Sequence, residues 1–371
     1  MLPFTRPTID EETIQGVAEV LRSGWLASGP KVAEFESALS RYLGGRPVRT
    51  QTSATASMEM ALLACGIGKG DEVITPAMSF VATANVIVRV GAHPVFVDVG
   101  LDSRNIDFEQ VEAAITPRTR AILPVHFAGL PCDMDRLYAL ARRHHLRVIE
   151  DAAHAIGASW KGQRVGSFGD LVCFSFHPNK NITTIEGGAV SGGSPEEVKS
   201  LELHRWHGQS KSAAGTDTLF AGGKANLSDV AARVGLGQLA RLEEFNAKRR
   251  ERVARYFDLW RADPPVRLPE RGDAGHGWHL FAPLLPLDRI RLSRAQFIEA
   301  MSARGIGVGV HYPAIHLFTA YRALGYREGQ FPNAERIGRE TITLPLFPAM
   351  ELSDVERVVR AVTEVIEGAR R

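Results

Sequence analysis

The chain has 371 residues, of which 44% are hydrophobic and 23% are charged, so its composition is that of a folded globular protein and excludes collagen-like, disordered and coiled-coil chains. Its 44 lysines and arginines balance 42 aspartates and glutamates, and the resulting net charge of +2 excludes the broad basic field that nucleic-acid binding requires. No signal-peptide pattern or membrane-length apolar run is present, so a cytoplasmic protein without a membrane partner is expected. Three widely spaced cysteines predict neither disulfides nor a metal site.

Helical periodicity begins the chain, at residues 9–21 and 32–42, with a turn-rich segment between the two stretches. Short β-branched runs then alternate with helical stretches such as residues 133–143. This alternation is typical of an α/β domain with a mainly parallel sheet. The predicted strands are residues 72–74, 94–98, 121–125, 147–150, 171–176 and 188–191.

A second, smaller domain is predicted after this block. Residues 263–277 are rich in proline and charge, and the segment that follows has its own strands and a final helix at residues 353–370. We therefore predict a large domain over residues 1–250 and a smaller C-terminal α+β domain over residues 251–371.

Polar residues follow two of the predicted strands, where ligands of open α/β sheets bind. Asp151 and His154 come after the strand at 147–150, and Ser175 and Lys180 lie at the end of the strand at 171–176. A run of small hydroxyl residues, 52–57, opens a helix.

These three places together suit one cofactor, pyridoxal phosphate. A lysine that reacts covalently must lose its proton near neutral pH, and Lys180 at a strand end can do so. The pyridine nitrogen needs a carboxylate, for which Asp151 is suitable. The phosphate needs N–H groups at a helix start together with hydroxyls, which residues 53–57 offer.

Each of these residues also has a purely structural interpretation. Loop lysines are usually solvated, and Asp151, Ser53 and Thr55 could cap helices. Residue types and spacing leave these alternatives open. The dinucleotide fingerprint is not matched, because the glycine-rich residues 66–71 do not have its third glycine at the required place, and no phosphate-loop Gly-Lys-Ser/Thr is present.

Several motifs occur in a fixed order that resembles the DegT/DnrJ/StrS sugar aminotransferases, almost from end to end. They are Ser23-Gly24-Trp25, residues 76–83, Val125-His126-Phe127-Ala128-Gly129, Glu150-Asp151-Ala152-Ala153-His154-Ala155, Phe174-Ser175-Phe176-His177-x-x-Lys180, Glu186-Gly187-Gly188, Asn226-Leu227-Ser228-Asp229 and residues 311–316.

The resemblance implies the type I aminotransferase fold and a homodimer with shared active sites. Lys180 is then the Schiff-base lysine, Asp151 contacts the pyridine nitrogen, and His154 approaches the ring hydroxyl. The remaining cofactor contacts it implies are the ring-stacking Phe80, the phosphate contacts Ala54, Thr55 and Ser175, and Asn226, which reaches the phosphate from the second subunit.

Two departures from the common family pattern indicate the substrate. Ala54-Thr55 stands where many relatives have Gly-Thr, and Asn226-Leu227-Ser228 stands where they have Asn-x-Arg-Met. Both variants resemble the subgroup that aminates C4 of the sugar, above all the enzyme that makes UDP-4-amino-4-deoxy-L-arabinose. The expected reaction is ping-pong transamination of a nucleotide-linked 4-keto sugar. Glutamate is the expected amino donor and becomes 2-oxoglutarate. Sugar or nucleotide contacts are expected from Trp25, His311, Tyr312 and His316.

Three alternatives remain at this point. A dehydratase on the same fold has histidine in place of the lysine, which Lys180 argues against. A non-catalytic sugar-nucleotide-binding regulator has no need of Lys180 and Asp151. A cofactor-free Schiff-base lyase leaves Asp151 and the phosphate site without a purpose. The sugar, the base and the pathway, whether surface polysaccharide or secreted metabolite, stay open.

Overall fold

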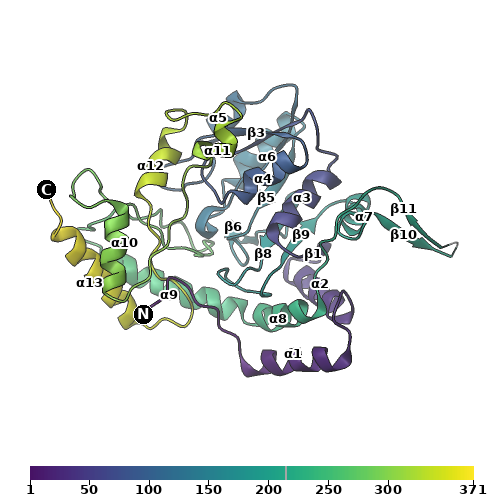
Figure 1. Cartoon of the computed structure of the whole chain (residues 1–371), viewed down its shortest axis with the longest axis horizontal. Helices are drawn as coiled ribbons and strands as arrows, with labels where there is room; N and C mark the ends of the chain where they lie inside the picture. The colour runs from purple at the N-terminus through teal and green to yellow at the C-terminus, as the bar shows by residue number, and fades with distance from the viewer. Residues whose placement is uncertain (214) are drawn as a thin grey trace.

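A seven-stranded sheet lies at the centre of the molecule, in a computed structural model that describes residues 1–213 and 215–371 (Figure 1). The strand order is β1-β9-β8-β5-β4-β2-β3. Strand β9 is antiparallel to β1 and β8, and all the other neighbours are parallel. The predicted α/β class with a mainly parallel sheet is thus confirmed. The strands are β1 (Val48–Gln51), β2 (Glu72–Pro76), β3 (His93–Val97), β4 (Thr119–Ile122), β5 (Arg147–Asp151), β8 (Leu171–Ser175) and β9 (Gly188–Gly192).

Both faces of the sheet are buried, which explains the nearly continuous apolar runs in its strands. Alternate residues of β8 enter different cores: Leu171 and Cys173 belong to one, Val172 and Phe174 to the other. The first face is covered by α3 (Ala54–Ala64), α4 (Ala82–Arg89) and α7 (Pro195–His204). The second is covered by α2 (Pro30–Tyr42) and α8 (Asp229–Ala240) at one end and by α5 (Phe108–Ala113) and α6 (Met134–Arg143) at the other.

Side-chain caps fix where several helices begin. Asp10 caps α1 (Glu11–Ser23) by accepting a hydrogen bond from the Thr13 amide, and Asp133 caps α6 in the same way. These caps agree with the helices predicted near residues 9–21 and 133–143, because an N-cap oxygen satisfies an amide that the helix itself leaves free.

Helix α9 (Leu242–Leu259) runs from the large core to a second core at the C-terminal end of the chain (Figure 1). Phe245 packs in the first core and Tyr256 in the second. The predicted boundary at residue 250 lies inside this helix, and Leu2 packs in the second core although it begins the chain. The division at residue 250 stays a prediction. The remaining helices of the C-terminal part are α10 (Arg294–Ala303), η2 (Ile315–Leu317), α11 (Thr319–Arg322), α12 (Pro332–Glu340) and α13 (Leu352–Glu367).

Short antiparallel strand pairs lie outside the central sheet. Strands β6 (Ser159–Trp160) and β7 (Gln163–Arg164) form one, and β10 (Gln209–Ser212) and β11 (Gly215–Thr218) form a hairpin that projects from the body (Figure 1). A short 3-10 helix, η1 (Phe127–Gly129), follows β4. None of the helices in the described part of the chain has the length and hydrophobicity of a membrane span.

Candidate functional site

A cavity of about 330 Å³ lies at the carboxyl ends of the central strands. Asp151 ends β5, and Lys180 lies in the loop that follows β8. The two strands are direct neighbours in the sheet, with Asp151 opposite Cys173, so topology brings these motifs to one place. Nine of the residues predicted from sequence line this cavity: Ala54, Thr55, Phe80, Asp151, His154, Ser175, Lys180, His311 and Tyr312.

Lys180 is held in a turn, with its amide donating to the His177 carbonyl at 2.9 Å. Loss of hydration lowers the pKa of its ammonium to about 8, although the negative charge of Asp151 acts in the opposite direction. Near neutral pH the uncharged, nucleophilic form of Lys180 is therefore a minority, but a far larger one than an ordinary lysine with a pKa of 10.5 would have, and this form is the one that reacts with a carbonyl.

Asp151 is only 4% exposed, and both of its carboxylate oxygens are hydrogen-bonded. The Thr83 hydroxyl donates to Oδ2 at 2.7 Å, and the Ala153 amide donates to Oδ1 at 3.1 Å. Burial is the largest effect and raises the pKa of Asp151 above its ordinary value, while these two donors and the charge of Lys180 limit that rise. The carboxylate is thereby fixed in orientation at the floor of the cavity.

The N-terminus of α3 forms another wall. Ser53 caps the helix by accepting from the Ala56 amide at 3.1 Å. The amides of Ala54 and Thr55 lie in the first turn, where the helix itself offers them no acceptor. Gly188 allows this close approach, since a Cβ there would lie 2.4 Å from the Ser53 carbonyl carbon and 2.5 Å from the Ala54 nitrogen. Together with Ser175, this wall fits a phosphate group.

Aromatic side chains form the remaining walls. Phe80 is 54% exposed, which is unusual for a phenylalanine, and its ring centroid lies 5.7 Å from that of Tyr312. Phe80 therefore presents an open face to the cavity, as a residue that stacks on a flat ring must.

His154 is neutral and has a defined tautomer. Its Nδ1 accepts from the Ala128 amide at 3.2 Å, so Nε2 carries the proton and donates to the Tyr312 hydroxyl at 3.2 Å. Burial, together with the nearby charges of Lys180 and His311, lowers the pKa of His154. Burial similarly lowers the pKa of His311 to about 4, and its Nδ1 pairs with the Thr343 hydroxyl at 2.7 Å.

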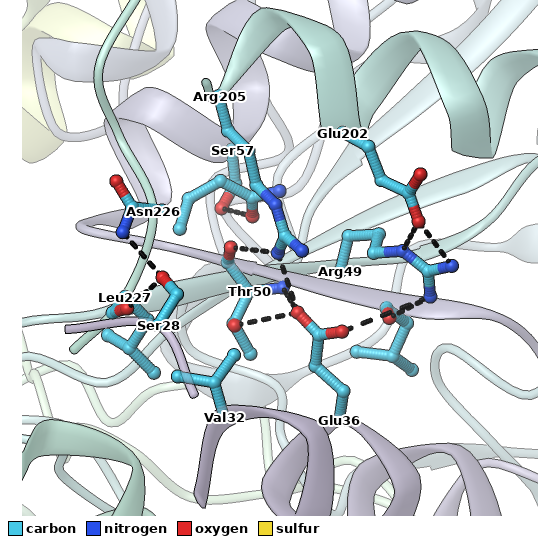
Figure 2. A network of polar contacts seen from close by, with 12 residues as sticks. Ser28, Val32, Glu36, Arg49, Thr50, Ser57, Glu202, Arg205, Asn226 and Leu227 are labelled. Atoms are coloured by element: carbon cyan, nitrogen blue, oxygen red, sulfur yellow. Dashed lines mark hydrogen bonds and ion pairs between the residues drawn. The ribbon is translucent and has the colours of Figure 1, made fainter. Parts of the chain in front are cut away.

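Three predicted residues do not line this cavity. Asn226 lies on a separate surface, where its amide donates to the Ser28 hydroxyl and Ser28 in turn donates to the Leu227 carbonyl at 2.8 Å (Figure 2). Trp25 belongs to the loop before α2 and is 65% exposed. His316 is fully buried and its Nε2 pairs with Glu335 at 3.0 Å, a position that does not support a substrate contact.

Sequence reasoning did not single out His177 and Glu186 as site residues, yet both line the cavity. Their side chains are 48% and 65% exposed, with 3.8 Å between His177 Nε2 and Glu186 Oε1. Both belong to the motif around Lys180, so proximity in sequence was the only available signal.

Comparisons with known proteins match nearly the whole chain. Residues 7–363 match the DegT/DnrJ/EryC1/StrS aminotransferase family. The chain belongs to this family. The spore coat polysaccharide biosynthesis protein SpsC of Bacillus subtilis is 40% identical to this aminotransferase over 380 residues, covering 99% of this chain and 98% of SpsC.

Solved structures show the same fold for this aminotransferase. Spr1654 of Streptococcus pneumoniae, described as a sugar aminotransferase, has in its PMP form a TM-score of 0.94 at 33% identity, covering 99% of this chain and 100% of that one. PseC of Helicobacter pylori, an aminotransferase involved in the biosynthesis of pseudoaminic acid, has a TM-score of 0.93 at 29% identity, with 99% of each chain covered. The type I aminotransferase fold is confirmed.

Pyridoxal 5′-phosphate is the cofactor of this aminotransferase family, and Spr1654 is also known in a PLP form. The cavity fits this group, because the free amides of α3 lie beside Gly188 at one wall and a buried carboxylate lies at the floor. Among residues 1–213 and 215–371, no cluster of three or more His, Cys, Asp or Glu side chains could hold a metal ion.

Proposed function

We propose that this protein transfers an amino group from glutamate to C4 of a nucleotide-linked 4-keto sugar, with Lys180 as the catalytic residue. The observation that carries the proposal is a lysine with a pKa lowered to about 8 beside a buried, doubly hydrogen-bonded Asp151, in a cavity that is also lined by a helix N-terminus. These are the three features that a pyridoxal-phosphate transaminase needs in one place.

Each residue has a distinct task in this proposal. Bound pyridoxal phosphate supplies an electron-poor ring that accepts the electron pair released when a neighbouring carbon loses a proton. Lys180 Nζ holds the cofactor aldehyde between turnovers and moves that proton within the site. Asp151 holds the proton on the ring nitrogen, and the amides of Ala54 and Thr55 bind the phosphate. The same residues serve both half-reactions, so ping-pong kinetics are expected.

The sugar assignment rests on sequence features of the subgroup. Ala54-Thr55 and Asn226-Leu227-Ser228 resemble the variants of the subgroup that aminates C4, and the pattern resembles that of the UDP-4-amino-4-deoxy-L-arabinose type. His311 and Tyr312 line the cavity and are suited to contact the sugar. We also propose a cytoplasmic homodimer. In support, Asn226 lies outside the cavity of its own chain, as a residue that serves a second subunit's site must.

The test is the visible absorption of the purified protein mixed with pyridoxal phosphate, then with glutamate, and finally with a UDP-linked 4-keto pentose or a 4-keto N-acetylated hexosamine. We expect a visible band that glutamate bleaches and the keto sugar restores. Lys180→Ala should lack the band. Lys248→Ala, a surface lysine paired with Glu244, should behave as the unmodified protein.

Other outcomes point to the alternatives. If the band never forms in the native protein, Lys180 does not bind the cofactor, and a sugar-nucleotide-binding regulator becomes the better interpretation. If the band forms but glutamate does not bleach it while the keto sugar is dehydrated, the protein is a dehydratase and the proposal is wrong.

A further inference from the structure

Two hydroxyl groups lie in a row beside the buried carboxylate of Asp151, one from α4 and one from the segment that precedes this helix. Thr83 lies in the first turn of this helix, is fully buried, and donates its hydroxyl proton to Asp151 Oδ2 at 2.7 Å. The Ser79 hydroxyl lies 2.8 Å from the Thr83 oxygen. Since Thr83 has a single proton and gives it to Asp151, Ser79 must donate to Thr83. The order of donors is thus Ser79, Thr83, Asp151.

We propose that Thr83 is a positioning residue for the cofactor: its hydroxyl keeps Asp151 ionised and aims the carboxylate at the pyridine nitrogen. The inference rests on the proposed place of Asp151 beside that nitrogen. Thr83 acts through Asp151 and does not line the cavity itself.

The Thr83 hydroxyl is important because Asp151 is buried and needs hydrogen-bond donors to carry a negative charge. An ionised carboxylate that is 4% exposed must replace its lost water with protein donors, and the described residues supply two, the Thr83 hydroxyl and the Ala153 amide. The Ala153 amide cannot be removed by a side-chain substitution. Thr83 is therefore the donor that a substitution can remove in order to change how readily Asp151 ionises.

A second acceptor competes for the Thr83 proton but is weaker. The Phe80 carbonyl lies 3.0 Å from the Thr83 oxygen, a longer contact than the 2.7 Å to Asp151. A hydrogen bond to a charged acceptor is shorter and about twice as strong as one to a neutral carbonyl. The Thr83 hydroxyl consequently donates to Asp151 while the carboxylate is ionised. Ser79 donates to the Thr83 oxygen from the other side and so fixes the rotamer of Thr83.

Thr83→Val tests the inference, because valine keeps the branched shape of threonine and replaces its hydroxyl with a methyl group that cannot donate. Thr75→Val is the matched control: Thr75 is also fully buried and donates to a backbone carbonyl, that of Leu123, at 2.9 Å, but it does not contact Asp151. Thr83→Ser retains the donor and should rescue the loss.

Two measurements apart from turnover report on Asp151 in the full-length protein. The first is the pH midpoint of its carboxyl ¹³C signal in protein without added cofactor. The second is the Kd for pyridoxal phosphate at neutral pH. For Thr83→Val we expect the midpoint to rise by about one pH unit and the Kd to increase roughly ten-fold, since a hydrogen bond to a charged group is lost. Both values should be unchanged in Thr75→Val.

Equal behaviour of Thr83→Val and Thr75→Val in both measurements would overturn the inference and leave Thr83 a packing residue. Asp151→Asn separates this failure from failure of the proposed function. If Asp151→Asn binds the cofactor as tightly as the native protein, the assignment of Asp151 is wrong. If it binds weakly while Thr83→Val binds normally, only the role of Thr83 is wrong.

Discussion

Lys180 has a pKa of about 8 because desolvation penalises its ammonium, and the charge of Asp151 limits how far that pKa falls. Only the uncharged amine attacks the cofactor aldehyde. The rate of cofactor uptake by cofactor-free protein should therefore rise with pH through about 8 and level off above it. Stopped-flow absorbance across the pH range measures this directly.

Asp151→Asn provides the matched variant for this prediction. Removing the negative charge removes the contribution that raises the Lys180 pKa, so the midpoint of the uptake profile should move to lower pH. A native midpoint near the ordinary lysine value of 10.5 would contradict the prediction, and an unshifted midpoint in Asp151→Asn would show that the two charges do not interact.

At the scale of elements, the phosphate wall depends on how closely α3 approaches β9. A Cβ on Gly188 would collide with backbone atoms of Ser53 and Ala54, which cannot move without displacing the helix N-terminus. Gly188→Ala should lower the free energy of unfolding by about 1–3 kcal/mol through overpacking. It should also weaken pyridoxal-phosphate binding, because the amides of Ala54 and Thr55 are displaced. Urea unfolding and cofactor titration measure the two effects.

Gly68→Ala is the control for this substitution, since a Cβ there meets only the Val90 carbonyl oxygen, at an ordinary 3.5 Å. It should leave cofactor binding unchanged. Unaltered binding in Gly188→Ala would mean that the N-terminus of α3 does not hold the phosphate.

For the whole molecule, Asn181 ties the lysine loop to the C-terminal part of the chain. Its Nδ2 donates to Asn246 on α9 and to the Gly277 carbonyl, both at 2.8 Å. Since Nδ2 makes both of these bonds, Oδ1 is the acceptor that His279 Nδ1 meets at 3.1 Å. The residue next to Lys180 is therefore held by segments from both cores.

Asn181→Leu should lower the free energy of unfolding by roughly 3 kcal/mol, because it leaves buried partners on both sides unpaired. Urea unfolding followed by circular dichroism measures this loss. Asn179→Leu, on the same loop but partly exposed and bonded, within residues 1–213 and 215–371, through its side chain to His177 alone, should cost less than about 1 kcal/mol. Equal losses in the two variants would show that the link through Asn181 does not contribute to stability.

The sequence by itself determined the alternation of strands and helices, because side-chain periodicity depends only on near neighbours in the chain. It also predicted that Lys180 and Asp151 share a site, since each lies near the carboxyl end of a predicted strand. Whether two strands are neighbours is a tertiary property, and only the pairing of β5 with β8 brought these residues together.

Only the tertiary structure decided contacts between distant segments. Thr83 meets Asp151 across 68 residues, and His316 turns away from the cavity to pair with Glu335. The sequence motif of Asn226 likewise did not predict its surface position, where it is bonded to Ser28, 198 residues earlier in the chain (Figure 2). Residue types show which groups need a partner, but the packing of whole elements selects the partner, because burial and distance are set by the fold.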